Sequence, residues 1–411
     1  MDAEQYLAEI PLWTRKKNTL ADVRHFLAEM GNPDDNMQII HVAGTNGKGS
    51  VCAYLSSELV RAGYRTGLFI SPHLVTIRER IQTDGQMIGQ EEFQETFEKV
   101  HQLVCKMIAM GYQHPSFFEY LFLMAMFYYR DNPVDYLVLE TGMGGLLDTT
   151  NVIRHPVLTV ITSISLEHTR YLGDTVEAIA GQKAGITKPG SPLVYDAGDE
   201  EANAVFAGQA KNLQIPVYPV AKPGREQQKG FCASYQAMNA AVACQALQLL
   251  SLPGWDAQAA FERMKSVVWS GRMEEILPDV WVDGAHNEGG IQAFTEAAKE
   301  ISQRTGKQIR LLFACVADKN YNHMIRLLCE QLTMKSVIIT RLDSERTSRI
   351  SDLEQEFCRC RPEMPVRGYA DVKQALKEAL SQKTEEELLF VAGSLYLIGE
   401  IKAALGGTGY V

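Results

Sequence analysis

The sequence predicts an α/β protein with two domains, a larger one over residues 1–270 and a smaller one over residues 271–411. Its 411 residues are too many for one ordinary hydrophobic core. Short apolar runs alternate with helical patterns along most of the chain, as expected for mostly parallel sheets. A glycine-rich turn inside residues 37–63 follows an apolar run and precedes a helical pattern, which indicates a P-loop-type first domain.

The composition is that of a soluble globular protein. Hydrophobic residues make up 46% of the chain and charged residues 22%. A net charge of −10 leaves no basic footprint for nucleic acid, so an anionic substrate needs local positive charge. We find no leader and no apolar run of transmembrane length, and therefore expect a cytoplasmic monomer without a membrane partner. The eight cysteines lack paired zinc spacing and are expected to be reduced thiols.

The glycine-rich turn HVAGTNGKGS carries the strongest local signal. Gly44 and Gly47 let the backbone approach phosphates, Lys48 adds a positive charge, and Ser50 can reach a Mg²⁺ ion. The general P-loop pattern is matched imperfectly, because Gly49 separates Lys48 from Ser50. The alternative is a plain strand-to-helix turn, which does not need a lysine between two glycines. We expect nucleotide phosphates to be bound by Gly44, Thr45, Asn46, Gly47, Lys48, Gly49 and Ser50.

The segments around this turn predict helices and a second strand. Residues 1–30 are expected to be helical and to end at an Asn-Pro-Asp-Asp turn. The apolar face of that segment is Leu12, Trp13, Leu20, Val23, Phe26 and Leu27. Residues 65–70 predict a strand that runs into the loop SPHLVTIRERI, where Arg78 and Arg80 make a ligand contact plausible. An amphipathic helix over 91–110 and a buried helix follow, the latter over Phe117 to Arg130.

Two further strands end in groups that can bind a metal. The run DYLVLET ends at Glu140, followed by glycines, and the strand from Val157 to Ile164 is followed by His168. Parallel strands of one sheet end at the same edge, so we expect Glu140 and His168 to lie together. A carboxylate there can bind Mg²⁺ or orient a water molecule, as in phosphoryl-transfer sites.

The remaining segments complete the first sheet and predict a second one. A strand, a helix and a strand are expected over 191–225, and an alanine-rich helix over 231–250. The domain junction is placed at 267–273. Strands and helices then alternate in a smaller, Rossmann-like α/β domain. The motifs DGAHN, ADKN and GSLYL each follow a strand of this second sheet, where a ligand crevice would open.

Together these motifs resemble the folylpolyglutamate synthase and dihydrofolate synthase family, relatives of the Mur ligases. The resemblance rests on HVAGTNGKGS, SPHLVTIRERI, ETGMGG with LDTTN, ITSISLEHT, IAGQKAGITKPG, DGAHN and GSLYL, in that order along the chain. It implies an enzyme that activates a folate carboxylate as an acyl phosphate with ATP and joins it to the amine of L-glutamate. Reduced folate, or dihydropteroate, and L-glutamate are then the small-molecule substrates.

The resemblance also assigns roles to single residues. It implies Mg²⁺ ligands at Ser71, Glu140 and His168, beside Ser50, and a carbamylated Lys183 that helps to hold a second Mg²⁺. It implies ATP contacts from Asn239, Arg272 and Asp283, folate or pterin contacts from Phe118, Asp148, Thr149 and Arg80, and glutamate contacts from His286 and Ser394. Lys48, Lys183 and His286 are the expected catalytic residues, and a monovalent cation is left open as a further cofactor.

Three positions depart from the family pattern. Leu146 stands where the family commonly has Arg, Glu167 where it has Asp, and Ser270 where it has Pro in the junction motif. Two alternative functions stay open from the residues alone. One is a Mur-type ligase for another acid and amino acid, and the other is a P-loop kinase or nucleotide-gated switch that forms no amide. A purely structural or binding role is disfavoured, because the residues expected at the metal site are chemically intact.

Overall fold

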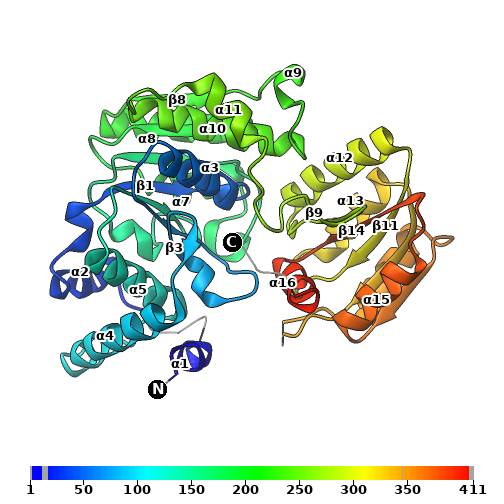
Figure 1. The fold of residues 1–411 in the computed structure, drawn as a ribbon, viewed down its shortest axis with the longest axis horizontal. Helices are drawn as coiled ribbons and strands as arrows, with labels where there is room; N and C mark the ends of the chain where they lie inside the picture. The colour runs from blue at the N-terminus through cyan, green and yellow to red at the C-terminus, as the bar shows by residue number, and fades with distance from the viewer. Residues whose placement is uncertain (1, 12–16, 345, 407–411) are drawn as a thin grey trace.

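The computed structural model describes residues 2–11, 17–344 and 346–406, and these residues form two lobes that each contain one sheet. The first lobe extends from α1 (Ala3–Glu9) to α11 (Ala257–Met264), and the second from β9 (Glu274–Leu277) to α16 (Leu395–Ala404). Figure 1 shows the lobes side by side, with their helices packed around the two sheets. The α/β class with mostly parallel sheets is confirmed.

The first sheet has eight strands in the order β4-β3-β2-β5-β1-β6-β7-β8. Its strands are β1 (Gln38–Ala43), β2 (Thr66–Phe69), β3 (Ile81–Thr83), β4 (Gln86–Met87), β5 (Tyr136–Glu140), β6 (Leu158–Ile161), β7 (Leu193–Asp196) and β8 (Val217–Val220). The short β3 and β4 pair antiparallel at one edge and were not predicted. They are only three and two residues long, too short to show a strand pattern.

The helices of the first lobe cover both faces of this sheet (Figure 1). Besides α1 and α11 they are α2 (Leu20–Glu29), α3 (Lys48–Arg61), α4 (Gln90–Ala109), α5 (Phe117–Asp131), α6 (Thr169–Leu172), α7 (Val176–Ala184), α8 (Glu200–Leu213), α9 (Arg225–Gln228) and α10 (Ser234–Leu249), with 3₁₀ turns η1 (Pro33–Asn36), η2 (Ile77–Arg80) and η3 (Thr149–Val152). The expectation of helix over residues 1–30 is realised as two helices, and Leu12 and Trp13 lie outside the described residues. The predicted buried helix is confirmed, since every residue of α5 from Glu119 to Tyr129 is buried.

The second sheet has six strands in the order β13-β12-β11-β14-β10-β9, with β9 antiparallel at one edge. Its other strands are β10 (Val280–Val282), β11 (Gln308–Phe313), β12 (Met334–Thr340), β13 (Val366–Tyr369) and β14 (Glu387–Ala392). Its helices are α12 (Glu288–Thr305), α13 (Tyr321–Gln331), α14 (Ile350–Cys360), α15 (Val372–Gln382) and α16. β13 and the helix after it were not predicted from the sequence, because β13 is a half-exposed edge strand with a glycine inside it.

The order of the strands decides where the functional groups lie. β1 lies between β5 and β6, and Val42 is paired with Glu140, so the glycine-rich turn, Glu140 and the loop after β6 emerge at one edge. In open parallel sheets ligands bind at this carboxyl edge. In the second sheet the segments after β10, β11 and β14 emerge together in the same way. The fold alone therefore brings the groups at the strand ends of each sheet close together.

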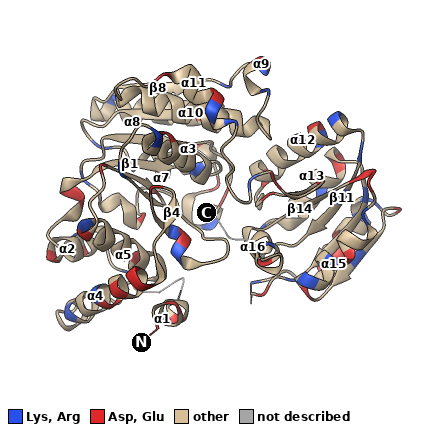
Figure 2. Cartoon of the chain, viewed as in Figure 1, with Lys and Arg blue, Asp and Glu red and all other residues tan. Residues whose placement is uncertain are grey.

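The cysteines, the surface charges and the polarity of the helices can be compared with the predictions made from composition. All eight cysteines are free thiols in the described chain. Figure 2 shows Lys and Arg interspersed with Asp and Glu along the helices of both lobes. None of the helices in the described ranges is long and apolar enough to cross a bilayer.

A buried ion-pair cluster in the second sheet makes one stability prediction. Glu387 is only 1% exposed and accepts hydrogen bonds from Arg310 Nε at 2.6 Å, from Thr384 N at 3.0 Å and from Lys335. Burial alone would raise the pKa of this carboxyl, but Arg310, Lys335 and the Thr384 amide lower the pKa to about 2. The folded-state pKa lies below the unfolded value, so the stabilisation is present above pH 4.5 and is lost as the pH falls toward 2.

We therefore expect Glu387→Gln to lower the free energy of unfolding at pH 7 by about 3 kcal/mol, because Arg310 and Lys335 lose their counter-charge. Urea unfolding of wild type and variant should give a difference that shrinks by about 1.4 kcal/mol per pH unit below pH 4.5. The exposed neighbour Glu385, changed to Gln, should show neither effect. A difference for Glu387→Gln that does not vary with pH would contradict this account.

Candidate active site

A cavity of about 1140 Å³ lies where the carboxyl edges of the two sheets face each other. The predicted site residues that line it are Gly44, Thr45, Asn46, Gly47, Lys48, Gly49, Ser50, Ser71, Arg80, Phe118, Glu140, Asp148, Thr149, His168, Lys183, Asn239, Arg272, Asp283 and His286. Ser394 is absent from that lining, and its hydroxyl instead accepts the Tyr396 amide at the start of α16. Residues of both lobes thus share one cavity.

The glycine-rich turn packs directly on its neighbours, which explains two of its glycines. Gly44 has φ +148° and Gly47 has φ +90°, backbone conformations that side chains rarely adopt. A Cβ on Gly44 would lie 1.8 Å from Thr162 Oγ1, and one on Gly47 would lie 2.3 Å from Asn239 Oδ1. Asn239, on α10, therefore lies directly against the turn, and its contact with ATP stays a prediction.

Two lysines converge on this turn from different helices. Lys48 Nζ donates to the carbonyl oxygens of Gly44 and Thr45, both at 3.2 Å, and Lys183 Nζ donates to Gly44 O at 2.7 Å. Lys183 is 3% exposed. Burial, and then the nearby charge of Lys48, lower the pKa of Lys183 to about 7. Part of the Lys183 population is therefore a neutral amine near pH 7.

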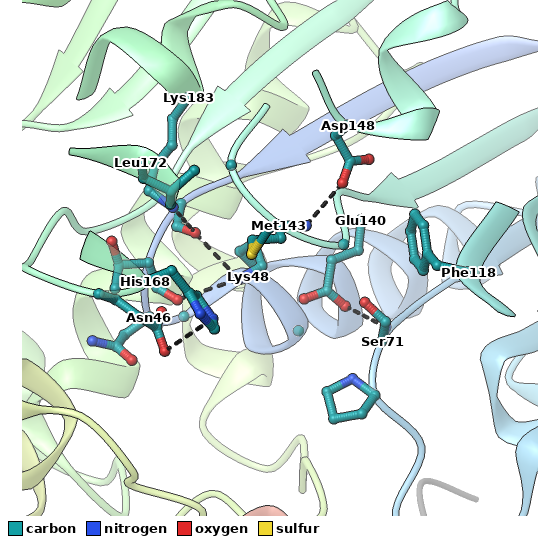
Figure 3. A pocket seen from close by; sticks show the side chains of 18 of the residues that line it. Asn46, Lys48, Ser71, Phe118, Glu140, Met143, Asp148, His168, Leu172 and Lys183 are labelled. Carbon is teal, nitrogen blue, oxygen red and sulfur yellow. Dashed lines mark hydrogen bonds and ion pairs between the residues drawn. The ribbon is translucent and has the colours of Figure 1, made fainter. Parts of the chain in front are cut away.

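The expected metal ligands line the same cavity. Figure 3 shows Glu140 facing Ser71, with Lys48, His168 and Lys183 around the cavity. Glu140 Oε2 accepts the Ser71 backbone amide at 2.9 Å. Burial raises the pKa of Glu140, while the charge of Lys48 and the Ser71 amide oppose that rise. The oxygen Ser50 Oγ is buried and has no hydrogen-bond partner among the residues that the structure describes, as expected of a hydroxyl oxygen that can bind a cation.

His168 adds a neutral imidazole to this edge. It sits in the left-handed region, with φ +50°, where it begins α6. Burial lowers the pKa of His168 to about 4, despite the opposing effect of Glu167. A neutral imidazole is the form that binds metals. Within the described ranges no three His, Cys, Asp or Glu side chains gather as a ready metal site, so a cation here would also need Ser oxygens, a modified lysine, water or substrate oxygens.

Glu167 joins the two lobes across the cavity. Its Oε1 lies 3.1 Å from His286 Nε2 and 3.0 Å from Lys319 Nζ, both on the second lobe. Burial acts to raise the pKa of Glu167, but the hydrogen bond from His286 and the charge of Lys319 hold that pKa well below its ordinary value. Asn287, beside His286, also exchanges amide hydrogen bonds with Asn46 of the turn at 3.0 and 3.1 Å.

Lys319 and Asn287 were not singled out as site residues from the sequence. Each lies in a motif that follows a strand, ADKN and DGAHN, and that position was the available signal. Their partners are remote in the chain, 152 residues away for Lys319 and 241 residues away for Asn287. Spacing along the sequence does not reveal such pairs.

Both carboxylate oxygens of Asp283 accept hydrogen bonds from the protein itself. Its Oδ2 accepts Tyr235 Oη–H at 2.5 Å and the Met273 amide at 2.9 Å, and Oδ1 accepts the Ala285 amide at 2.9 Å. Tyr235 belongs to α10 of the first lobe, so this cluster ties the lobes together beside Arg272. Tyr235 was missed from the sequence. The predicted contact of Asp283 with a ribose stays a prediction.

The opposite end of the cavity is apolar with few polar groups. Phe118 stacks close over Gly142, where a Cβ would lie 2.7 Å from the ring. Arg80 lies 5.1 Å from the Phe117 ring centroid and donates from Nε to His73 Nδ1 at 2.9 Å. Further apolar lining of the cavity comes from Leu20, Val23, Met143 and Leu147, and Figure 3 shows Leu172 on the other side, beside Lys183. This end can enclose a flat ring and leave an anion near Arg80.

The position of Leu146 answers one question raised by the sequence. Leu146 is 45% exposed and is not part of the cavity lining, whereas its neighbour Leu147 is. The Leu146 carbonyl accepts Asn151 Nδ2 at 2.9 Å, and its amide donates to Gln182 O. Leu146 therefore contributes no side chain to the lining of this cavity.

Comparison with known proteins places the chain among ligases. Residues 271–395 match the family model described as Mur ligase, glutamate ligase domain. The chain is 32% identical over 420 residues to the dihydrofolate synthase/folylpolyglutamate synthase of Bacillus subtilis, with 95% of each chain covered. It is 31% identical to the mitochondrial folylpolyglutamate synthase of Homo sapiens, over 86% of this chain and 68% of that protein.

A solved structure agrees over the whole length. The folylpolyglutamate synthase of Mycobacterium tuberculosis, complexed with ADP and AMPPCP, matches with a TM-score of 0.86 and 26% sequence identity. The match covers 98% of this chain and 97% of that chain, both lobes included.

Proposed function

The chain belongs to the folylpolyglutamate synthase and dihydrofolate synthase family of the Mur ligases, and from that membership we propose that it uses ATP to join L-glutamate to a folate carboxylate. The reaction passes through an acyl phosphate, which the glutamate amine attacks to give an amide, ADP and phosphate. The observation that supports this most is the single cavity between the lobes. It brings Lys48 and Glu140 of the first lobe opposite Arg272 and His286 of the second.

Positive groups in the cavity offset the repulsion between the two anionic substrates. ATP and a folate carboxylate are both anions, and their approach is unfavourable unless positive groups lie between them. Lys48, the amide groups at the start of α3, and Arg272 supply such groups around the phosphates. Glu140 and His168 line the same cavity, and a metal held by them would add to this neutralisation.

The residues present fit magnesium. Ser50 Oγ is an unpartnered buried oxygen, Glu140 is a buried carboxylate, and His168 is a neutral imidazole. When bound there, Mg²⁺ offsets the charge of the transferring phosphate. Carbamylation of Lys183 would replace an ammonium by an anionic oxygen ligand, and its pKa of about 7 leaves an amine free to take up CO₂. We assign Ser50, Ser71, Glu140, His168 and the modified Lys183 to this metal site.

The folate is placed at the apolar end. Phe118 and the neighbouring apolar wall face the pterin ring, Asp148 and Thr149 offer acceptors to its N–H groups, and Arg80 faces the carboxylate-bearing tail. The incoming glutamate is placed at the second lobe near His286, with Ser394 behind it on α16. Dihydropteroate fits the same end, because it carries the same ring, and the Bacillus subtilis relative is named for both activities.

The test is release of phosphate from ATP with tetrahydrofolate or dihydropteroate as acceptor and L-glutamate as donor. We expect release to require an acceptor and L-glutamate together, and mass spectrometry to show an acceptor extended by one glutamyl residue. Alanine and D-glutamate serve as control donors. Phosphate release that ignores L-glutamate would refute the proposal, and a product that carries only phosphate would identify a kinase instead. Extension of a different acid in a panel of acceptors would identify a Mur-type ligase of other specificity.

A further inference from the structure

A histidine in the central strand is buried where an aliphatic residue would normally pack. His41 lies in β1, between Leu139 of β5 and Thr159 of β6, and has no exposed surface. Its Nε2 lies 2.8 Å from Thr150 Oγ1, and its Nδ1 is buried without a hydrogen-bond partner in the described part of the chain. Such burial of a polar ring costs free energy, and the proposed chemistry does not use the ring.

The hydrogen bonds fix which atom carries each proton. Thr150 Oγ1 lies 2.5 Å from Asp148 Oδ1, and an ionised carboxylate can only accept, so the Thr150 hydroxyl donates to it. The hydroxyl proton is then used, and Thr150 Oγ1 must accept from His41. His41 is therefore the neutral tautomer with its proton on Nε2, and Nδ1 carries the lone pair that has no donor to accept from. The chain of donation runs from His41 to Thr150 to Asp148.

This chain holds Asp148 against its own loop, where the carboxylate also accepts a hydrogen bond from the Gly142 amide. Oδ1 accepts the amide and the hydroxyl of Thr150, at 3.0 and 2.5 Å, and Oδ2 accepts the Met143 amide at 2.8 Å. Asp148 is 6% exposed and lines the cavity. Figure 3 shows it on the wall that Phe118 and Met143 share. A carboxylate fixed in this way presents its oxygens to the cavity in one orientation, toward an N–H donor of a flat heterocycle.

We infer that His41 is a positioning residue for the pterin-binding carboxylate: its Nε2–H holds the Thr150 hydroxyl so that this hydroxyl orients Asp148 toward the ring. The inference rests on the proposed function, because it takes the ligand at Asp148 to be a pterin. His41 does not touch the ligand. Its influence passes through Thr150, and it should appear in the binding of the pterin substrate and not in the binding of ATP.

The experiment measures dissociation constants of tetrahydrofolate and of ATP by equilibrium dialysis. We expect His41→Leu to weaken tetrahydrofolate binding about tenfold, the effect of one charge-coupled hydrogen bond, and to change ATP binding by less than about twofold. His41→Gln, whose amide can donate near the Nε2 position, should recover most of the loss. Thr159→Val removes a buried hydroxyl from the adjacent strand and should leave both constants unchanged.

A double-mutant cycle separates action through Thr150 from a general loss of packing. We expect Thr150→Val to weaken tetrahydrofolate binding as much as His41→Leu does, and the double variant to be no weaker than Thr150→Val alone. Additive effects, or unchanged binding in both single variants, would overturn the inference. Thr150→Val retains the histidine and supplies the measurement if His41→Leu does not fold. Failure of the wild type to bind either tetrahydrofolate or dihydropteroate would instead reject the proposed function.

Discussion

Replacing Lys48 with Met is expected to lower kcat by about 1,000-fold and to leave the fold intact. Lys48 is the first residue of α3, and its Nζ reaches the carbonyl oxygens of Gly44 and Thr45 at the edge of the cavity. In the proposed reaction the positive charge of Lys48 stabilises the negative charge that develops on the transferred phosphate. The loss of one preorganised donor at such a point costs about 100-fold to 1,000-fold in rate. A lost full charge should fall at the upper end.

The measurement is the rate of phosphate release at saturating ATP, tetrahydrofolate and L-glutamate. Arg61→Gln, at the exposed end of the same helix, is the matched control and should retain the wild-type rate. Thermal unfolding should place Lys48→Met close to the wild type, because the Met stem can occupy the same space. A variant that retains more than a tenth of the wild-type kcat would show that Lys48 does not face the transferred phosphate.

The site residues that could be predicted from the sequence lie within one continuous motif or at the end of a predicted strand. The glycine-rich turn was recognisable because Gly44, Gly47 and Lys48 need no partner elsewhere to reveal their chemistry. Glu140 and His168 were expected at one edge because parallel strands align their carboxyl ends, and both line the cavity. Local pattern and strand direction were sufficient for these residues.

The parts that could not be predicted depend on contacts between distant segments. Glu167 meets Lys319 and His286 only because the lobes face each other, and Tyr235 meets Asp283 for the same reason. The unpartnered hydroxyl of Ser50 and the buried ring of His41 are likewise properties of packing. In the second sheet, β13 was not predicted because an edge strand need not alternate apolar and polar residues. These features follow from tertiary structure, which a sequence pattern does not contain.

Replacing Lys183 with Met is expected to abolish activity and to stabilise the fold at the same time. Lys183 is 3% exposed, and its pKa of about 7 lies below the ordinary value of 10.5. The unfolded chain therefore binds a proton that the folded chain releases between pH 7 and 10.5, and stability rises with pH across that range. Below pH 7 the full penalty is present. Met removes the buried charge, so the free energy of unfolding at pH 7 should rise by about 2 kcal/mol, and this gain should shrink as the pH approaches 10.

A lysine with only a structural role would behave in the opposite way, losing stability together with activity. Urea unfolding at pH 7 and pH 9.5 distinguishes the two cases, with Lys211→Met on the exposed face of α8 as the control. Bicarbonate provides a second test, because carbamylation turns the buried ammonium into the anionic ligand that the metal site needs. Carbon-13 bicarbonate should give a carbamate signal and a higher midpoint of thermal unfolding in the wild type, and neither in Lys183→Met. Lower stability of Lys183→Met at pH 7, with no carbamate signal from the wild type, would assign Lys183 to the support of the Gly44 turn instead.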